Sequence, residues 1–208
     1  MMPHKSRSDI AKILSLIVGI SGITVMIGWI FGISVLKSLS HDWVSMKFDT
    51  AIAFLLSGIS LYFMARAAEG EFDISQVVLS ITSLIIMLFI GILFFSALLG
   101  VRTGVEELFI RDSARSIATV VPGRPSIPTM MDFMFIALAA ILTILDIKRF
   151  HPSLRGIGLI IGLTGALAIV GYIINAPLLY YYIKGINSAM ACHTAALFVL
   201  LGAGLICL

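Results

Sequence analysis

Six runs of apolar residues, each about as long as a membrane-crossing helix, dominate the sequence. They fall at 12–36, 47–65, 76–100, 129–147, 156–178 and 189–208. A helix needs about 20 such residues to cross the hydrocarbon layer. Only helices and closed barrels satisfy their backbone hydrogen bonds in lipid, and the runs lack the alternation of barrel strands. The sequence therefore predicts an all-α membrane protein with six transmembrane helices, in a single integral membrane domain at 1–208.

The composition excludes an ordinary soluble domain. Hydrophobic residues make up 60% of the chain and charged residues 12%, with a mean hydropathy of +1.10, whereas soluble domains are nearer half apolar and a quarter charged. The lipid bilayer is thus the expected partner. The net charge of +3 fits basic cytoplasmic loops and predicts no nucleic-acid partner. Both cysteines, Cys192 and Cys207, lie in apolar runs, which is unlike a disulfide framework or a zinc pattern.

An even number of spans places both termini on the same side of the membrane. Lysine and arginine divide equally between the two sides, so their total does not orient the chain. The basic segment before the first apolar run usually dominates orientation. We therefore expect a multi-pass plasma-membrane protein with both termini in the cytoplasm.

A thirteen-residue pattern occurs three times, at 46–58, 125–137 and 190–202. Alignment of the three copies gives columns of Thr50, Thr129 and Thr194, of Phe54, Phe133 and Phe198, and of Gly58, Ala137 and Gly202. Residues four apart share one helical face. The threonine can cap the helix start, the phenylalanine can fill a pocket, and the small residue lets another helix approach closely.

Each copy opens a helix that returns from the outer side. The pattern therefore predicts three tandem two-helix hairpins, at about 12–65, 76–147 and 156–208, in a pseudo-threefold bundle with the patterned helices facing the axis. The alternative is coincidence, because these residue types are common in any membrane helix. The outer loop 101–128 is expected to be partly an amphipathic helix, on the membrane surface or as a lid.

Three stretches resemble a known membrane region. They are "VSMKFDTAIAFLLSGISL", "GRPSIPTMMDFMFIALAAILTIL" and "NSAMACHTAALFVLLGAGLICL". They are similar to an N-terminal membrane region of bacterial and archaeal sensor histidine kinases and diguanylate cyclases, often followed by PAS domains. The resemblance implies a sensory input domain in signal transduction, including two-component systems, with a C-terminal cytoplasmic output module and a homodimer as expected partners. The last apolar run ends without a basic flank, which favours a truncated chain or a stand-alone relic of such a region.

Asp132 is the ionisable residue that lies most clearly within a predicted span. Such a group costs a few kcal/mol and usually faces a cavity or a partner. With Arg124, Lys47, Asp49 and His193 it would form a polar ring near the outer end. Thr50, Thr129 and Thr194 lie at the same level. The hypothesis is an outward-facing pocket for a small or amphipathic ligand, and the alternative is plain solvation of these groups at the membrane interface.

Metal or haem binding at His193 is the less favoured interpretation. His193 lies beside Cys192, Met190 and, in the first copy, Met46, and such ligands suit copper(I). It is also the histidine within a span that could ligate haem. A histidine hydrogen-bonded near the interface explains it more simply, so we expect no cofactor and no metal. Trp29 is read as an interfacial aromatic residue.

Two other function classes stay open beside the sensory one. A small transporter or channel would favour more charges deep in the spans or an inverted repeat with broken helices. A membrane enzyme using the outer polar ring would need several histidines and carboxylates at one level. The sequence has no glycine-rich phosphate loop after a strand, so we expect no enzyme activity within these residues and place any output kinase or cyclase module outside them.

Overall fold

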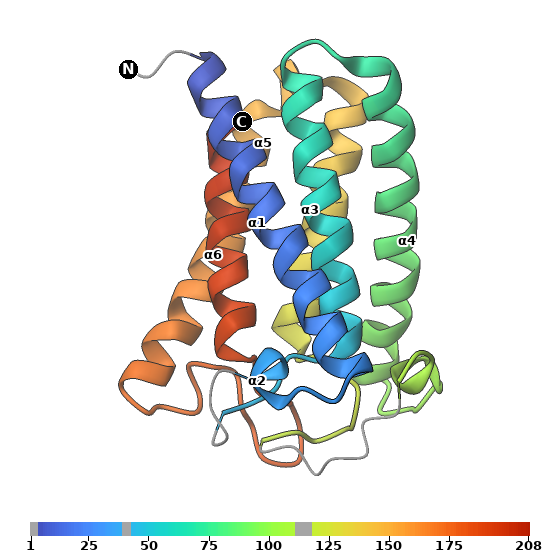
Figure 1. The fold of residues 1–208 in the computed structure, drawn as a ribbon, viewed down its shortest axis with the longest axis vertical. Helices are drawn as coiled ribbons and strands as arrows, with labels where there is room; N and C mark the ends of the chain where they lie inside the picture. The colour runs from blue at the N-terminus through green and yellow to red at the C-terminus, as the bar shows by residue number, and fades with distance from the viewer. Residues whose placement is uncertain (1–3, 39–42, 111–117) are drawn as a thin grey trace.

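A computed structural model gives the fold for residues 4–38, 43–110 and 118–208, with only the backbone for 4, 5 and 146–150. The elements are α1 (His4–Ile30), α2 (Ser34–Lys37), α3 (Phe48–Ala68), α4 (Phe72–Leu98), the 3₁₀ turn η1 (Val105–Glu107), α5 (Ile127–Ile173) and α6 (Cys192–Cys207). Within these described ranges the nearest approach to a strand is one antiparallel bridge, Ile183 to Asn187. The all-α prediction is confirmed (Figure 1).

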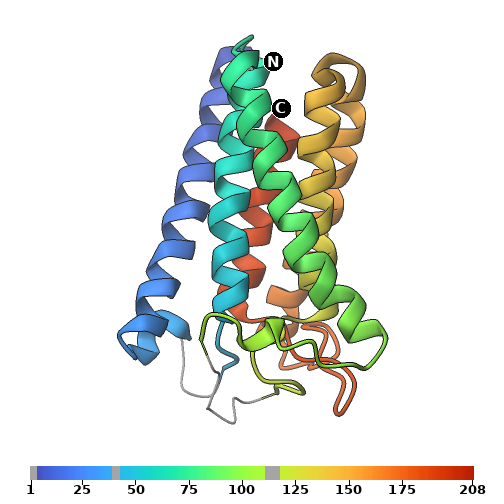
Figure 2. The ribbon, with the colours of Figure 1, turned by 90° about the vertical axis from the view of Figure 1, so that its right-hand side faces the viewer.

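The two halves of α5 run side by side in opposite directions (Figures 1 and 2). Phe133 in the first half contacts Phe198 of α6, with ring centroids 5.0 Å apart. Gly165 in the second half lies against Ala195, which is about one turn from Phe198 on α6. In a straight helix the two α5 residues would be about 50 Å apart. The reversal falls between the two apolar segments, just before Pro152, a residue that breaks the helical hydrogen-bond ladder.

Five segments are long and apolar enough to cross a membrane, which indicates a multi-pass membrane protein. They are Ser6–Ile30, Phe48–Ala68, Phe72–Leu98, Ile127–Leu145 and His151–Ile173. The sixth apolar helix, α6, has 16 residues, fewer than the roughly 20 that a perpendicular crossing needs. Each of the six predicted segments thus overlaps a helix, and five of these helical segments are long enough to cross a membrane.

Both chain ends lie at one end of the bundle, and the long loops lie at the other (Figure 1). Arg7 Nη2 donates to the carbonyl oxygen of Ile206 at 3.2 Å, so the first and last helices are joined at the terminal end. At the loop end, the described part of 101–128 contains η1 rather than a longer helix. Much of the predicted amphipathic helix fell on 111–117, outside the described residues.

Two pairs of helices approach each other through glycine. A Cβ added at Gly58 of α3 would lie 2.7 Å from the Ser15 carbonyl oxygen and 2.9 Å from Gly19 Cα of α1. A Cβ added at Gly202 of α6 would lie 2.5 Å from the Gly158 oxygen and 2.7 Å from the backbone of Gly162, in the second half of α5. The small residue of the repeated pattern therefore sits against the backbone of the preceding apolar helix in both pairs.

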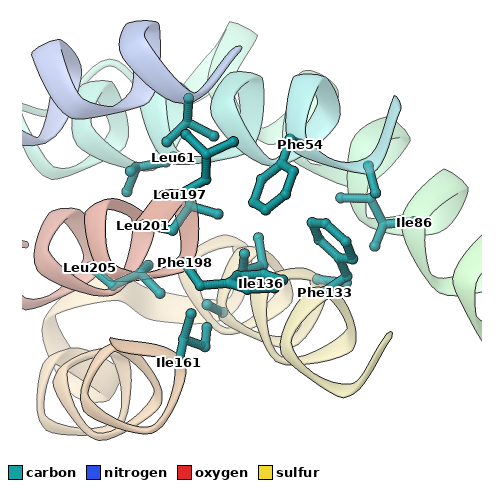
Figure 3. Packing of buried hydrophobic residues seen from close by; sticks show 14 of the residues in the cluster. Phe54, Leu61, Ile86, Phe133, Ile136, Ile161, Leu197, Phe198, Leu201 and Leu205 are labelled. Carbon is teal, nitrogen blue, oxygen red and sulfur yellow. The ribbon is translucent and has the colours of Figure 1, made fainter. Parts of the chain in front are cut away.

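The phenylalanines of the pattern meet at the centre of the bundle (Figure 3). Phe54, Phe133 and Phe198 come from α3, α5 and α6 and have no exposed surface. The ring centroids are 4.9 Å apart for Phe54 and Phe133, 4.9 Å for Phe54 and Phe198, and 5.0 Å for the third pair. The three rings thus form a nearly equilateral triangle that closes the space between the inner helices.

Candidate functional site

A pocket opens at the loop end of the bundle. It lies one helical turn closer to the loops than the phenylalanine triangle does. Its lining consists of Ser45, Met46, Lys47, Thr50, Arg124, Pro125, Ser126, Thr129, Ala189, Met190, Ala191 and Thr194. These twelve residues are the same four aligned positions from each copy, namely three positions within the pattern and the residue just before it. The pocket has an empty volume of about 220 Å³ with its open mouth included, while the part that a water-sized sphere can enter is about 10 Å³, room for about one water molecule.

The chain enters each of the three inner helices in the same way. The residues before α3, α5 and α6 are Lys47, Ser126 and Ala191, and all three are extended, with φ of −73°, −68° and −68° and ψ of 153°, 152° and 148°. Ser126 caps its helix by accepting a hydrogen bond from the Thr129 amide at 3.4 Å. The first turns of three helices therefore converge on the pocket, and helix starts carry unsatisfied N–H groups and a partial positive charge.

Aromatic residues at the ends of two outer helices hold the pocket lining in place. Trp29 Nε1 of α1 donates to the carbonyl oxygen of Met46 at 2.8 Å. Tyr172 Oη of α5 donates to the carbonyl oxygen of Met190, also at 2.8 Å. Met46 and Met190 occupy the same column of the repeat, so the two bonds are equivalent. Trp29 was predicted only as an interfacial aromatic residue. An aromatic residue with a polar tip near the end of both apolar runs was the sequence signal for this pair of hydrogen bonds.

In the second copy an ion pair lies behind the pocket wall. Arg124 Nη2 lies 2.5 Å from Glu106 Oε1 and donates to the Val101 carbonyl oxygen at 2.6 Å. Glu106 Oε2 accepts from the Gly104 amide at 2.9 Å. Gly123 has a φ of +75°, and a Cβ there would lie 2.1 Å from the Glu106 carbonyl oxygen, so only glycine fits. Glu106 was not among the predicted site residues, although it belongs to an acidic pair in the same loop as Arg124.

The predicted polar ring divides into two sets. Lys47, Arg124 and the three threonines line the pocket, while Asp49, Asp132 and His193 are absent from its lining. Asp49 and His193 each stand next to a pocket-facing threonine, and successive helix residues point about 100° apart, so their side chains turn toward neighbouring helices. Asp132 is three positions after Thr129, almost one turn further from the pocket mouth. Among the described residues, Oδ2 of both aspartates and both ring nitrogens of His193 are buried without a hydrogen-bond partner.

No group of three or more His, Cys, Asp or Glu side chains suited to a metal ion was found among the described residues. No protein family, curated protein or solved structure was found to match the chain. The interpretation of the site therefore rests on its own geometry.

Glu106→Gln is expected to lower the free energy of unfolding by about 3 kcal/mol at neutral pH, because it leaves the buried Arg124 charge without its counter-ion. Burial alone would raise the pKa of Glu106, but the hydrogen bonds and charge of Arg124 outweigh it and lower that pKa below its ordinary value of 4.5. The stabilisation is thus present above about pH 4.5 and is lost as pH falls through the lowered pKa.

The measurement is thermal unfolding in neutral detergent between pH 3 and 7. The wild type should lose stability at the acid end, and the Glu106→Gln curve should stay flatter over that interval. Glu107→Gln removes the neighbouring, exposed carboxylate and serves as the control. Parallel curves for wild type and Glu106→Gln would contradict a structural role for the ion pair.

Proposed function

We propose that this chain is a membrane-embedded sensory input domain that binds a small ligand at the threefold pocket and passes a conformational change to the opposite end. In this proposal α6 completes a sixth span, the six spans form three tandem hairpins, and the pocket faces outward from a plasma membrane with both termini in the cytoplasm. An output module would follow the terminal end, and a homodimer would be the working unit.

The convergence of the three pattern copies on one pocket is the observation that carries the proposal. Twelve residues from four aligned positions line it, and they lie at or just before the starts of α3, α5 and α6, which are at the end of the bundle opposite both termini (Figure 1). The resemblance of the same three stretches to membrane regions of sensor kinases and cyclases points to the same role. A repeat that served packing alone would need only the phenylalanine and small-residue columns, which are buried deeper in the bundle than the pocket. It would not need a polar cavity at the loop end.

The phenylalanine triangle favours a binding site over a transport path. Three rings with centroids about 5 Å apart fill the centre one turn below the pocket. A solute that entered the pocket would meet this closed layer. The alternative of a transporter or channel would require the three rings to separate, whereas a sensory domain requires only the helix starts to move.

The narrowness of the pocket supplies a physical link between binding and movement. A ligand shifts a conformational equilibrium only when it binds two states with different affinity. Because the enterable part of the pocket measures about 10 Å³, any ligand group larger than a water molecule fits better when the starts of α3, α5 and α6 are further apart. Ligand binding would thus favour a spread arrangement of the inner helices.

Thr129→Phe tests this proposal, because the larger side chain should fill the pocket and imitate the spread arrangement. The chain is joined at Leu208 to a diguanylate cyclase catalytic module, and cyclic dinucleotide production is measured in isolated membranes. We expect the output to change at least threefold. Leu138→Phe, on the same helix but 39% exposed, is the matched control and should leave the output unchanged. Equal output from wild type, Thr129→Phe and Thr194→Phe would refute a signalling role for the pocket.

A further inference from the structure

We propose that the pocket recognises an oxyanion group, a carboxylate or a phosphodiester, through Arg124, Lys47 and the starts of α3, α5 and α6. The inference rests on the proposed function of the pocket as the ligand site. It adds the chemical class of the ligand, which neither the repeat nor the resemblance supplies.

The two cations stand where the repeat places small residues. The column that holds Arg124 has Ser45 and Ala189 in the other copies, and the column that holds Lys47 has Ser126 and Ala191. Two of the three copies thus close this end of the bundle with small side chains in each column. Small side chains therefore suffice for packing at these positions, and the two cations add positive charge to the pocket lining.

Both cations are largely removed from solvent, which carries a free-energy cost. Lys47 is 5% exposed and Arg124 is 8% exposed. Burying a charge is costly, and a buried ion pair such as Arg124–Glu106 is often no more stabilising than apolar residues of the same volume. Arginine has five N–H donors, and Arg124 Nε has no partner among the described residues. Glu106 acts as a positioning residue that fixes the guanidinium at the pocket wall while this donor is left over.

The helix starts add to the attraction for an anion. The residues that precede α3 and α6 form no side-chain capping hydrogen bond, so the first-turn N–H groups of these helices are not satisfied in that way. Helix N-termini with such groups are favourable sites for oxyanions. Two such uncapped starts converge here with the capped start of α5 and the two cations.

The size of the pocket narrows the ligand. The enterable part of about 10 Å³ accommodates about one oxygen atom, and the remainder of the group can lie in the mouth, within the 220 Å³ that includes the opening. A carboxylate and a phosphodiester both present such an oxygen, the first on a soluble molecule and the second on a lipid headgroup.

The intrinsic fluorescence of tryptophan can report binding directly. The chain has two tryptophans, and Trp29 is hydrogen-bonded to Met46 of the pocket lining. A Trp43→Phe background leaves Trp29 as the single reporter. The purified full chain in neutral detergent is titrated with sodium acetate, with chloride replaced so that ionic strength stays constant. We expect a saturable change in Trp29 emission.

Variants assign the response to the pocket. Arg124→Gln and Lys47→Gln are each expected to weaken acetate binding at least tenfold. Lys184→Gln removes an exposed lysine at the same end of the bundle and should bind as the wild type does. Size-exclusion chromatography checks folding. If Arg124→Gln fails to fold because Glu106 is left buried, the Arg124→Gln/Glu106→Gln pair and Lys47→Gln alone still test the proposal.

Nanodiscs distinguish the two sources of the oxyanion. Phosphatidylcholine discs with and without phosphatidylglycerol are compared by the same emission. A pocket-dependent response to phosphatidylglycerol but not to acetate supports a lipid headgroup, and the reverse supports a soluble carboxylate. The proposal is overturned when neither probe gives a saturable response, or when Arg124→Gln and Lys47→Gln respond as the wild type does. Anion binding without any change in cyclase output would refute the sensory function alone.

Discussion

Gly202→Val is expected to separate α6 from the second half of α5 and to cost about 3 kcal/mol or more of stability. A Cβ at this position would lie 2.5 Å from the Gly158 carbonyl oxygen and 2.7 Å from Gly162 N and Cα. All three are backbone atoms, so no side-chain rotation relieves the clash, and the two helices must move apart. Thermal unfolding of the purified chain in detergent measures the loss.

Gly91→Ala is the matched control for this prediction. Gly91 is also buried in an apolar helix, but a Cβ there would meet nothing within 4 Å. Alanine is the better helix former by about 1 kcal/mol, so this variant should be neutral or slightly more stable. A Gly202→Val protein as stable as the wild type would show that α6 does not pack closely against α5.

Phe133→Ala is expected to destabilise the bundle by about 3 kcal/mol, because it empties one corner of the central triangle. The other two rings, Phe54 and Phe198, would each lose a contact at 4.9–5.0 Å. Aromatic pairs at such distances contribute beyond the area that they bury. Since the triangle is nearly equilateral, Phe54→Ala and Phe198→Ala should cost about as much.

The triangle also predicts a specific deviation from additivity. Phe54→Ala combined with Phe198→Ala should cost less than the two single changes together, because the pair contact is removed only once. Phe95→Ala, on the outer surface of α4 and 58% exposed, is the control and should have a small effect. Additive costs within about 0.3 kcal/mol would show that the rings do not interact.

Much of the fold was predictable because hydropathy and helix length depend on local sequence. The end of the chain shows the limit. Sequence analysis began the last helix at 189, whereas Cys192 is its first residue. Ala189, Met190 and Ala191 are apolar and continue the hydropathic run without interruption, yet in the structure they precede the helix and line the pocket, and Ala191 is extended. Hydropathy cannot distinguish a buried extended segment from a helical turn.

The candidate site was predictable where residues repeat and not where they interact at long range. The threonine column places the pocket because a position four before a core phenylalanine must lie one turn above it. The charges of Asp49 and Asp132 do not indicate which way the side chains point, and neither residue lines the pocket. Glu106 meets Arg124 across 18 positions of a loop, and a loop has no periodicity from which such a contact could be deduced.

Close glycine contacts join some pairs of helices and not others. This difference affects how easily neighbouring helices can slide past each other. In α1 with α3, and in the second half of α5 with α6, backbone lies directly on backbone, so sliding would drive main-chain atoms into one another. Between α4 and the first half of α5 no such glycine contact occurs: the small residue of the repeat there is Ala137, and a Cβ added at Gly91 of α4 would meet nothing within 4 Å. Shear between packed helices proceeds by such small sliding steps. We therefore expect sliding to be easier between α4 and the first half of α5, which are joined by the loop that holds Glu106 and Arg124, than within the two glycine-packed pairs.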